Sequence, residues 1–358
     1  MTLRLACCLI VSLALAGCDF NDKPTANAPK PKPVQTAQPT DDQRFVDMKD
    51  AGEQPSPQSP LHLQVVLDRL GFAPGVIDGA EGRFHDEALR GFQRSRDLAE
   101  TGKLDEDTKR ALAQWDRLPA LRVVRIPAGF AKGPFFADLP ARTADQARYP
   151  ALGYRNLQEK LAERFHTKPE LLARLNPRAT WRAGEAIRVP NIPEADVAGA
   201  KGEDRGWPQT LAMLGVSANQ PQADHVVVDK SDRLLRVFDA QDRLIAQFPA
   251  TMGSTHDPLP IGKWTIKGVS WNPPFHYNPD LFWDASSKDE KAVLKPGPNG
   301  PVGVVWIDLS KPHYGIHGTP EPDNIGRSES HGCIRLSNWD AARLAQMVKT
   351  GIPAIFQP

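Results

Sequence analysis

The last third of the chain constrains the fold most, because short apolar runs follow one another there with a turn after each. From about Asp224 onward, segments rich in Val, Ile, Phe and Trp are separated by Asp, Gly and Pro, which is the pattern of consecutive β-strands. An amphipathic helix is predicted at 338–348. We therefore expect a mostly-β domain at 223–357. Its predicted strands are 225–229, 234–238, 244–250, 262–267, 302–309 and 352–356.

The N-terminus is predicted to be a targeting segment. Arg4 precedes an apolar run, 5–15, that is too short to span a bilayer as a mature helix. The run ends in the letters LAGC, which resemble a bacterial lipobox with cleavage before Cys18 and lipid on its sulfur; an ordinary signal peptide is the alternative. The resemblance implies a signal peptide at 1–17 and a lipid-anchored periplasmic protein. Asp19 favours retention at the inner membrane.

Cysteine usage singles out one thiol. Of the 4 cysteines, Cys7 and Cys8 leave with the signal peptide and Cys18 is predicted to carry the lipid. Cys333 then remains as a free thiol in an oxidising compartment, where an unpaired cysteine is a candidate reactive group. An inert buried cysteine is the alternative, and the neighbours of Cys333 decide between the two.

Those neighbours favour a reactive thiol. In an extended chain, alternation places His331, Cys333 and Arg335 on one side. An imidazole and a guanidinium create a positive field, which favours the nucleophilic thiolate. His317 ends an earlier apolar run, from which it could reach Cys333 across neighbouring strands.

Two glycines lie beside these groups. Gly318 and Gly332 add no side-chain bulk, so their backbone N–H groups can donate to a developing oxyanion. His331 and Arg335 have a structural alternative as supports of the site, and Arg335 could pair with a carboxylate such as Asp340. One usable cysteine gives no zinc pattern, and we predict no metal and no cofactor.

The spacing of these residues resembles that of one enzyme family. His317-Gly318, followed by SHGCIR at 330–335 and by Asn338, resembles the L,D-transpeptidase (YkuD) catalytic domain. The upstream segment PATMGSTHDPLPIGKWTIKGV resembles the strand pair that precedes the active site in this family. Where many members have Thr-Pro-x-Gly, this chain has LPIG at 259–262. The resemblance covers about 224–356.

The resemblance implies an acyl transfer. Cys333 attacks the carbonyl between the third residue of a stem peptide, usually meso-diaminopimelate, and the D-alanine at position four. His317 keeps the thiol ionised, and Gly318 holds its imidazole through the backbone carbonyl. The residues expected to line the oxyanion region or shape the pocket are Ser330, His331, Gly332 and Arg335. An amine then resolves the thioester, which either forms a 3→3 cross-link or attaches a lysine-bearing lipoprotein. An L,D-carboxypeptidase, with water as acceptor, and a non-catalytic wall-binding protein are the alternatives.

Two accessory segments precede this domain. Helical spacing and an Asp78-Gly79 turn at 59–115 resemble the three-helix peptidoglycan-binding domain. At 150–194, LAERFHTKPELLARLNP and AGEAIRVPNI resemble a small α+β LysM module that binds N-acetylglucosamine chains; a structural linker subdomain is the alternative. The predicted fold class is therefore multidomain, with a mostly-β catalytic domain, a helical bundle and a LysM-like module.

The remaining sequence suggests a tether and a single class of partner. Residues 18–58 are rich in Pro, Ala, Lys, Gln and Thr, which predicts a disordered linker. A net charge of +1 gives no case for nucleic-acid binding. The predicted partners are the stem peptides and glycan strands of peptidoglycan, with the membrane reached through lipidated Cys18.

Overall fold

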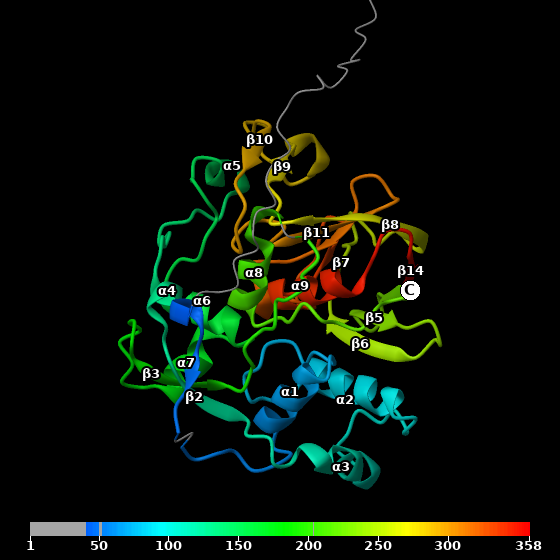
Figure 1. The fold of residues 1–358 in the computed structure, drawn as a ribbon. Coiled ribbons are helices and arrows are strands. Elements are labelled where there is room, and N and C mark those ends of the chain that lie inside the picture. Colours follow the sequence, from blue (N-terminus) through cyan, green and yellow to red (C-terminus); the bar gives the residue numbers. More distant parts are fainter. Residues whose placement is uncertain (1–40, 50–51, 203) are drawn as a thin grey trace, which may run out of the picture. The chain divides into compact units, whose positions relative to one another are not determined.

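The C-terminal strands form one large sheet (Figure 1). The structure is a computed structural model that describes residues 41–49, 52–202 and 204–358. Within them the strand order is β6-β5-β4-β14-β8-β11-β12-β13-β7. These strands are β4 (His225–Asp229), β5 (Leu234–Phe238), β6 (Leu244–Pro249), β7 (Thr251–Met252), β8 (Gly262–Trp271), β11 (Val305–Leu309), β12 (Gly315–His317), β13 (Ile334–Arg335) and β14 (Pro353–Gln357).

Every strand predicted from the apolar runs is present, which confirms a mostly-β domain. The main difference is β8, which continues to Trp271 because it pairs with both β14 and β11. The predicted C-terminal helix is α9 (Asn338–Met347), whose N-cap Ser337 accepts a hydrogen bond from the Asp340 backbone N–H. Helix α9 lies next to α8 (Trp207–Leu214), which follows η3 (Asp204–Gly206), and both contribute side chains to the core of the sheet.

The helical segment contains the three expected helices. They are α1 (Pro60–Arg69), α2 (Arg83–Ser95) and α3 (Glu106–Leu112), followed by η2 (Ala113–Trp115). Asp105 caps α3 by accepting a hydrogen bond from the Thr108 backbone N–H. The core of the bundle includes Phe238 and Leu244 of the β5–β6 hairpin. The bundle therefore shares apolar contacts with the large sheet.

A second, small sheet lies in the middle of the chain. Strand β2 (Leu121–Arg125) pairs antiparallel with β3 (Ala186–Pro190), and the expected helices α6 (Leu157–Arg164) and α7 (Pro169–Leu175) lie between them in sequence. The predicted range 150–194 omits β2, because 126–156, with α4 (Ala128–Ala131) and α5 (Thr143–Gln146), separates this strand from the helices. The likeness of this segment to a LysM module stays a prediction.

The prediction of a disordered linker at 18–58 is wrong for the part that the structure describes. Residues 41–49 contain η1 (Asp41–Gln43) and β1 (Val46–Asp47), which pairs with β2. The reason is one aromatic side chain: Phe45 is buried, with ring centroids 4.8 Å from Phe130 and 5.1 Å from Phe165. Residues 1–40, which include Cys18, Asp19 and the predicted signal peptide, lie outside the described residues.

A hairpin inserted in the large domain covers part of its surface. Strands β9 (Phe275–Tyr277) and β10 (Ala292–Leu294) pair antiparallel, and the loop 278–291 between them contains η4 (Pro279–Leu281). The hairpin packs against the segment around α5 (Figure 1) through an apolar cluster. The buried members of this cluster are Leu139, Leu152, Tyr277 and Leu294.

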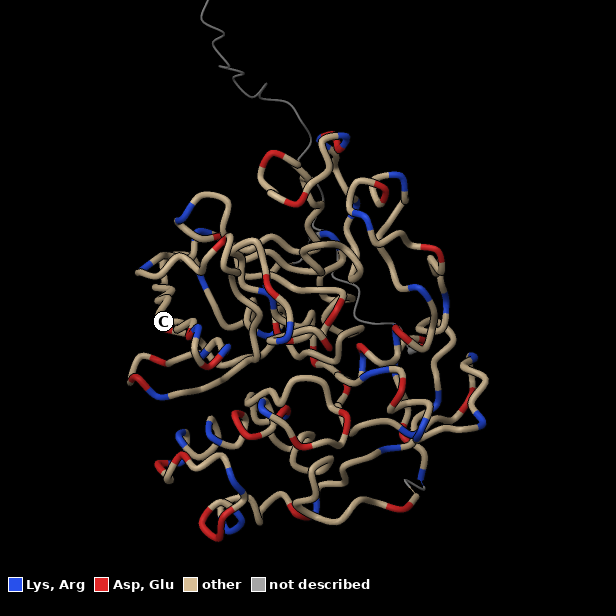
Figure 2. Tube along the Cα trace, turned by 180° about the vertical axis from the view of Figure 1, so that it is seen from behind, with Lys and Arg blue, Asp and Glu red and all other residues tan. Residues whose placement is uncertain are grey.

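Basic and acidic residues are interspersed along the described trace (Figure 2). Several form short-range pairs on helices, such as Lys109 with Glu106 at 2.7 Å. In the described part of the chain, no helix combines the length and apolar character needed to cross a membrane.

Candidate active site

Strand pairing places the two central residues on neighbouring strands. Strands β12 and β13 are parallel, with Ile316 opposite Ile334 and His317 opposite Arg335. Cys333 directly precedes β13. Cys333 and Arg335 are two residues apart, so side-chain alternation puts them on the same face of the sheet. His317 pairs with Arg335 and therefore lies on that face too.

The Cys333 thiol is half-buried and faces backbone groups of the loop before β12. Its Sγ donates to the His313 carbonyl oxygen at 3.7 Å. Burial raises the pKa of the thiol, while the Gly315 N–H and the Arg335 charge lower it, and the net change is upward. Desolvation therefore opposes the positive field that was predicted to favour the thiolate.

The His317 imidazole is buried and fixed in one orientation. Its Nδ1 donates to the Gly318 carbonyl oxygen at 2.7 Å, and its ring stacks on Trp306 with centroids 5.5 Å apart. Burial and the Arg335 charge lower its pKa to about 3, against the opposing effect of the Gly318 carbonyl. The ring is therefore neutral, and with the hydrogen on Nδ1 its Nε2 can accept a proton.

Burial disfavours the charged form of both the thiol and the imidazole. Among the described residues, no hydrogen bond joins Cys333 to His317. Hydrogen bonds between catalytic groups are often loose before substrate binds and tighten in the complex. The arrangement fits a base that takes the thiol proton during attack rather than a preformed ion pair.

Ser330 holds the loop that carries Cys333. Its hydroxyl donates to the Cys333 carbonyl oxygen at 2.6 Å and accepts from the Gly253 N–H at 2.7 Å. The Ser330 N–H donates in turn to the Gly253 carbonyl at 3.1 Å. Since Ser330 is buried, it connects the Cys333 loop to the end of β7 rather than lining an open pocket.

The two glycines differ in what they do. Gly332 has φ +93°, and an added Cβ would lie 2.5 Å from the Tyr314 ring, so a side chain here is excluded. Gly318 donates its N–H to the Val305 carbonyl at 3.4 Å. The Gly318 N–H is therefore engaged in the sheet, and the expectation that it serves an oxyanion is wrong.

His331 does not continue the alternation predicted from an extended chain, because residues 331–333 form a bend at Gly332. Its Nε2 lies 2.9 Å from Asp284 Oδ1, and Phe282 contacts its ring edge-on. Both partners belong to the loop 278–291, so this loop lies against the segment that carries Cys333. Sequence reasoning missed Asp284, since nothing local marks a carboxylate 47 residues away in the chain.

The other aromatic residues of this region divide into two groups. Phe275, Tyr277 and Phe282 pack within the hairpin cluster. Trp283 is 61% exposed and stacks on His256 with centroids 4.7 Å apart. Packing of the hairpin therefore accounts for Phe275, Tyr277 and Phe282, whereas Trp283 lies exposed beside His331.

Replacing Asp284 with asparagine tests the link between the loop and the nucleophile segment. We expect kcat/KM to fall by about 3- to 10-fold, because a part-exposed hydrogen bond to a charged group contributes about 1 kcal/mol. Steady-state kinetics of the catalysed reaction measure the effect. The matched control is Asp280→Asn in the same loop, whose carboxylate pairs with Lys291 at 3.5 Å. Equal values for both variants and the wild type would contradict a role for the Asp284–His331 contact.

Arg335 lies beside the thiol, as alternation predicted, but not beside Asp340. Its guanidinium donates to the Glu329 carbonyl at 3.4 Å. Asp340 instead accepts from the Ser337 hydroxyl at 2.8 Å. The suggested Arg335–Asp340 pair is therefore wrong, and the Arg335 charge acts on Cys333 and His317.

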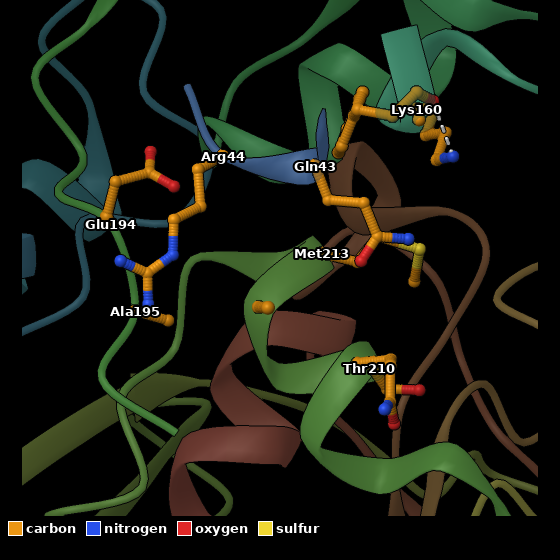
Figure 3. A pocket seen from close by; sticks show the side chains of 11 residues that line it. Gln43, Arg44, Lys160, Glu194, Ala195, Thr210 and Met213 are labelled. Atoms are coloured by element: carbon orange, nitrogen blue, oxygen red, sulfur yellow. Dashed lines mark hydrogen bonds between the residues drawn. The ribbon is translucent and has the colours of Figure 1, made fainter. Parts of the chain in front are cut away.

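A separate pocket of about 170 Å³ lies between η1, α4, α6 and α8 (Figure 3). Lys160 borders it and donates to the Phe130 carbonyl at 2.7 Å, and burial lowers its pKa to about 8. None of the predicted site residues lines this pocket. Its lining comprises Gln43, Arg44, Gly129, Phe130, Lys160, Glu194, Ala195, Gln209, Thr210, Ala212 and Met213.

Comparison with known proteins matches two segments of the chain to family models. A family model described as "L,D-transpeptidase catalytic domain" matches residues 223–355, and one described as "Putative peptidoglycan binding domain" matches residues 57–112. The "Putative L,D-transpeptidase YkuD" of Bacillus licheniformis is 28% identical over 203 residues, which cover 56% of this chain and 93% of the relative. The protein of the same name from Bacillus subtilis (strain 168) is 27% identical and covers 53% and 87%.

More distant matches come from other bacteria. "Probable L,D-transpeptidase YbiS" of Escherichia coli (strain K12) is 28% identical over 132 residues, which cover 35% of this chain and 42% of the relative. Among solved structures, an L,D-transpeptidase from Mycobacterium smegmatis matches 38% of this chain and 59% of its own, with 23% identity and a TM-score of 0.32. Taken with the family matches, the curated relatives lead to one conclusion: the chain carries a YkuD catalytic domain at residues 223–355 and a peptidoglycan-binding domain at residues 57–112, and it is an L,D-transpeptidase.

Proposed function

We propose that this L,D-transpeptidase acts on peptidoglycan stem tetrapeptides through an acyl-enzyme on Cys333. The sulfur attacks the carbonyl of the third residue while the thiol proton passes to Nε2 of His317. The C–N bond to D-alanine then breaks, and His317 returns the proton to the departing amine. An acceptor amine forms the new amide with the acyl carbon as the C–S bond breaks and the sulfur regains a proton.

The observation that supports this mechanism most is the orientation of His317. With Nδ1 committed to the Gly318 carbonyl, the ring can act only through Nε2, and a neutral ring is the competent form of a general base. Cys333 is the free cysteine among the described residues. The backbone N–H groups of Gly332 and Cys333 are the proposed oxyanion donors, at a bend where glycine leaves room for the substrate.

The accessory segments suggest the setting of the reaction. A peptidoglycan-binding domain in the same chain supports peptidoglycan as the partner. We propose that the segment 150–194 binds glycan strands in the manner of a LysM module, and that lipid on Cys18 holds the protein at the periplasmic face of the inner membrane. The acceptor amine is either a second stem peptide, giving a 3→3 cross-link, or a lysine-bearing lipoprotein.

Product analysis with disaccharide-tetrapeptide tests the proposed reaction. The full-length protein should release D-alanine and form a cross-linked dimer, both detected by mass spectrometry. A tripeptide as the sole product would instead identify an L,D-carboxypeptidase, in which water takes the place of the amine. Cys333→Ala should form neither product. Unchanged product from this variant, or none from the wild type, would contradict the proposal.

A further inference from the structure

The first residue of α9 lies behind the candidate active site and is held by three hydrogen bonds. Asn338 is fully buried. Its Oδ1 accepts from the Val304 N–H at 3.2 Å, and its Nδ2 donates to the Pro298 carbonyl at 3.0 Å. The third bond runs from Nδ2 to Glu163 Oε1 at 2.7 Å. Glu163 lies on α6, outside the catalytic domain at 223–355.

The Asn338 amide lies directly against the peptide that orients the proposed base. A Cβ added at Gly318 would overlap with Asn338 Oδ1, and so would one added at Gly303. The amide therefore fills the space that these two glycines leave. The carbonyl of Gly318 is the group that accepts from Nδ1 of His317. The contacts thus run without a gap from Glu163 through Asn338 and Gly318 to His317.

Glu163 is itself firmly held. The Tyr154 hydroxyl donates to its second carboxylate oxygen, so each oxygen has one partner. Burial raises the pKa of Glu163 to about 7, against the lowering effect of its bonds with Tyr154 and Asn338, and the Glu159 charge raises it further. Besides burial, Tyr154, Asn338 and Glu159 are the groups that shift its pKa. A buried carboxylate with both oxygens engaged has a fixed position, so it can orient the amide that donates to it.

We propose that Glu163 is a positioning residue for the transpeptidase reaction, supplied by the segment before the catalytic domain: it orients the Asn338 amide, which supports the Gly318 peptide and thereby keeps His317 in its productive orientation. The inference rests on the proposed role of His317 as the base. It implies that the catalytic domain is incomplete without α6. Because outer residues that orient a catalytic group commonly affect activity by about 10- to 100-fold, the effect is measurable.

Three variants of the full-length protein separate positioning from packing. Glu163→Met keeps the side-chain volume and removes both acceptors, whereas Glu163→Gln keeps one acceptor for Asn338. Gln158→Met is the matched control, since Gln158 lies on the same helix and donates to the Pro169 carbonyl at 2.9 Å rather than contacting Asn338. The measurements are kcat and KM for D-alanine release, the melting temperature, and the ¹⁵N chemical shifts of the His317 ring.

The expected result is specific to Glu163→Met. We expect its kcat to fall by about 10-fold or more with KM unchanged, and the ¹⁵N shifts of His317 to report a second tautomer. Glu163→Gln and the Gln158→Met control should retain the wild-type kcat and a single tautomer. A wild-type kcat with a single tautomer in Glu163→Met overturns the inference, and so does an equal loss in the control.

If Glu163→Met does not fold, Tyr154→Phe serves as the second variant, because it removes the hydroxyl that holds Glu163. The ¹⁵N shifts of His317 should again report a second tautomer. Unchanged shifts overturn the inference. If the wild type releases no D-alanine, the proposed function fails. The tautomer measurement needs no turnover, so it still decides whether Glu163 positions His317.

Discussion

We expect His317→Gln to lower kcat for D-alanine release by about 10²- to 10⁴-fold, the usual contribution of a positioned general base. Glutamine fills much of the space of the imidazole but cannot take a proton from the Cys333 thiol near neutral pH. The loss should be large because burial raises the pKa of that thiol, so little thiolate forms without a base. Steady-state kinetics with a tetrapeptide substrate measure this effect.

The control for this variant is His225→Gln. His225 lies on β4, which β14, β8 and β11 separate from β12 in the large sheet, and its ring stacks on Phe238. Its replacement should leave kcat unchanged. An activity of His317→Gln within a factor of about 3 of the wild type would contradict general-base catalysis by this residue.

The second large effect concerns a buried charge cluster that joins α1 to the rest of the structure. Asp68 of α1 is 1% exposed, and its carboxylate lies 3.1 Å from Nδ1 of His166 and 3.3 Å from Nη2 of Arg343 on α9. The Nε2 of His166 faces the Leu214 carbonyl at 2.8 Å, and its ring stacks on Trp339. Three distant segments therefore meet at one carboxylate.

Asp68→Ala should lower the free energy of unfolding by about 3–5 kcal/mol at pH 7, because it leaves the buried Arg343 and His166 without their partner. The matched control, Asp107→Ala, removes an exposed helix pair with Arg110 and should cost less than about 1 kcal/mol. Urea unfolding of both variants and the wild type gives the values. A loss at Asp68 no larger than the loss at Asp107 would contradict the proposed importance of the cluster.

The Asp68 contribution should also depend on pH with a definite sign. Burial alone would raise the pKa of Asp68, but His166 and Arg343 outweigh it and hold the pKa below its ordinary value of 3.8. A depressed pKa gives a contribution that is present above this ordinary value and is lost as pH falls below it. The difference between wild type and Asp68→Ala should therefore shrink in acid.

Asp340 on α9 has the opposite behaviour. Burial raises its pKa to about 6, although Arg343 and Ser337 lower it. Because the folded state holds the Asp340 proton more tightly than the unfolded state, this group adds to the free energy of unfolding at low pH. That contribution is lost as the pH rises from about 4 to about 6. The two carboxyls therefore oppose each other in acid, and because the Asp68 charge contributes to the raised pKa of Asp340, Asp68→Ala should weaken both dependences together.

Local patterns in the sequence predicted the centre of the site. His317-Gly318 and the segment around Cys333 are short motifs, and an extended chain was predicted around Cys333. The two short strands that carry them, β12 and β13, were not among the predicted strands. The parallel pairing of β12 with β13 then brings them together. The Gly318 carbonyl holds His317 as the family resemblance implied.

Interactions between distant segments could not be predicted in this way. Glu163 and Asn338 are 175 residues apart, and Asp68 and Arg343 are 275 apart, so no local pattern connects them. The burial of the Cys333 thiol was also out of reach, and burial raises the pKa of this thiol against the charge of Arg335, a neighbour that the sequence does show. The order around Phe45 depends on the burial of one aromatic side chain. The linker prediction rested on the average composition of a polar segment, in which a single phenylalanine has little weight.

The thioester itself gives the most direct test of covalent acyl transfer by Cys333. Full-length protein is mixed with disaccharide-tetrapeptide and quenched in acid, and its intact mass and its proteolytic peptides are measured. We predict an added mass equal to that of the substrate less D-alanine, located on the peptide that contains Cys333 and missing from Cys333→Ala. An adduct on another residue would contradict covalent transfer by Cys333. Turnover at the wild-type rate in Cys333→Ala, without any adduct, would contradict it as well.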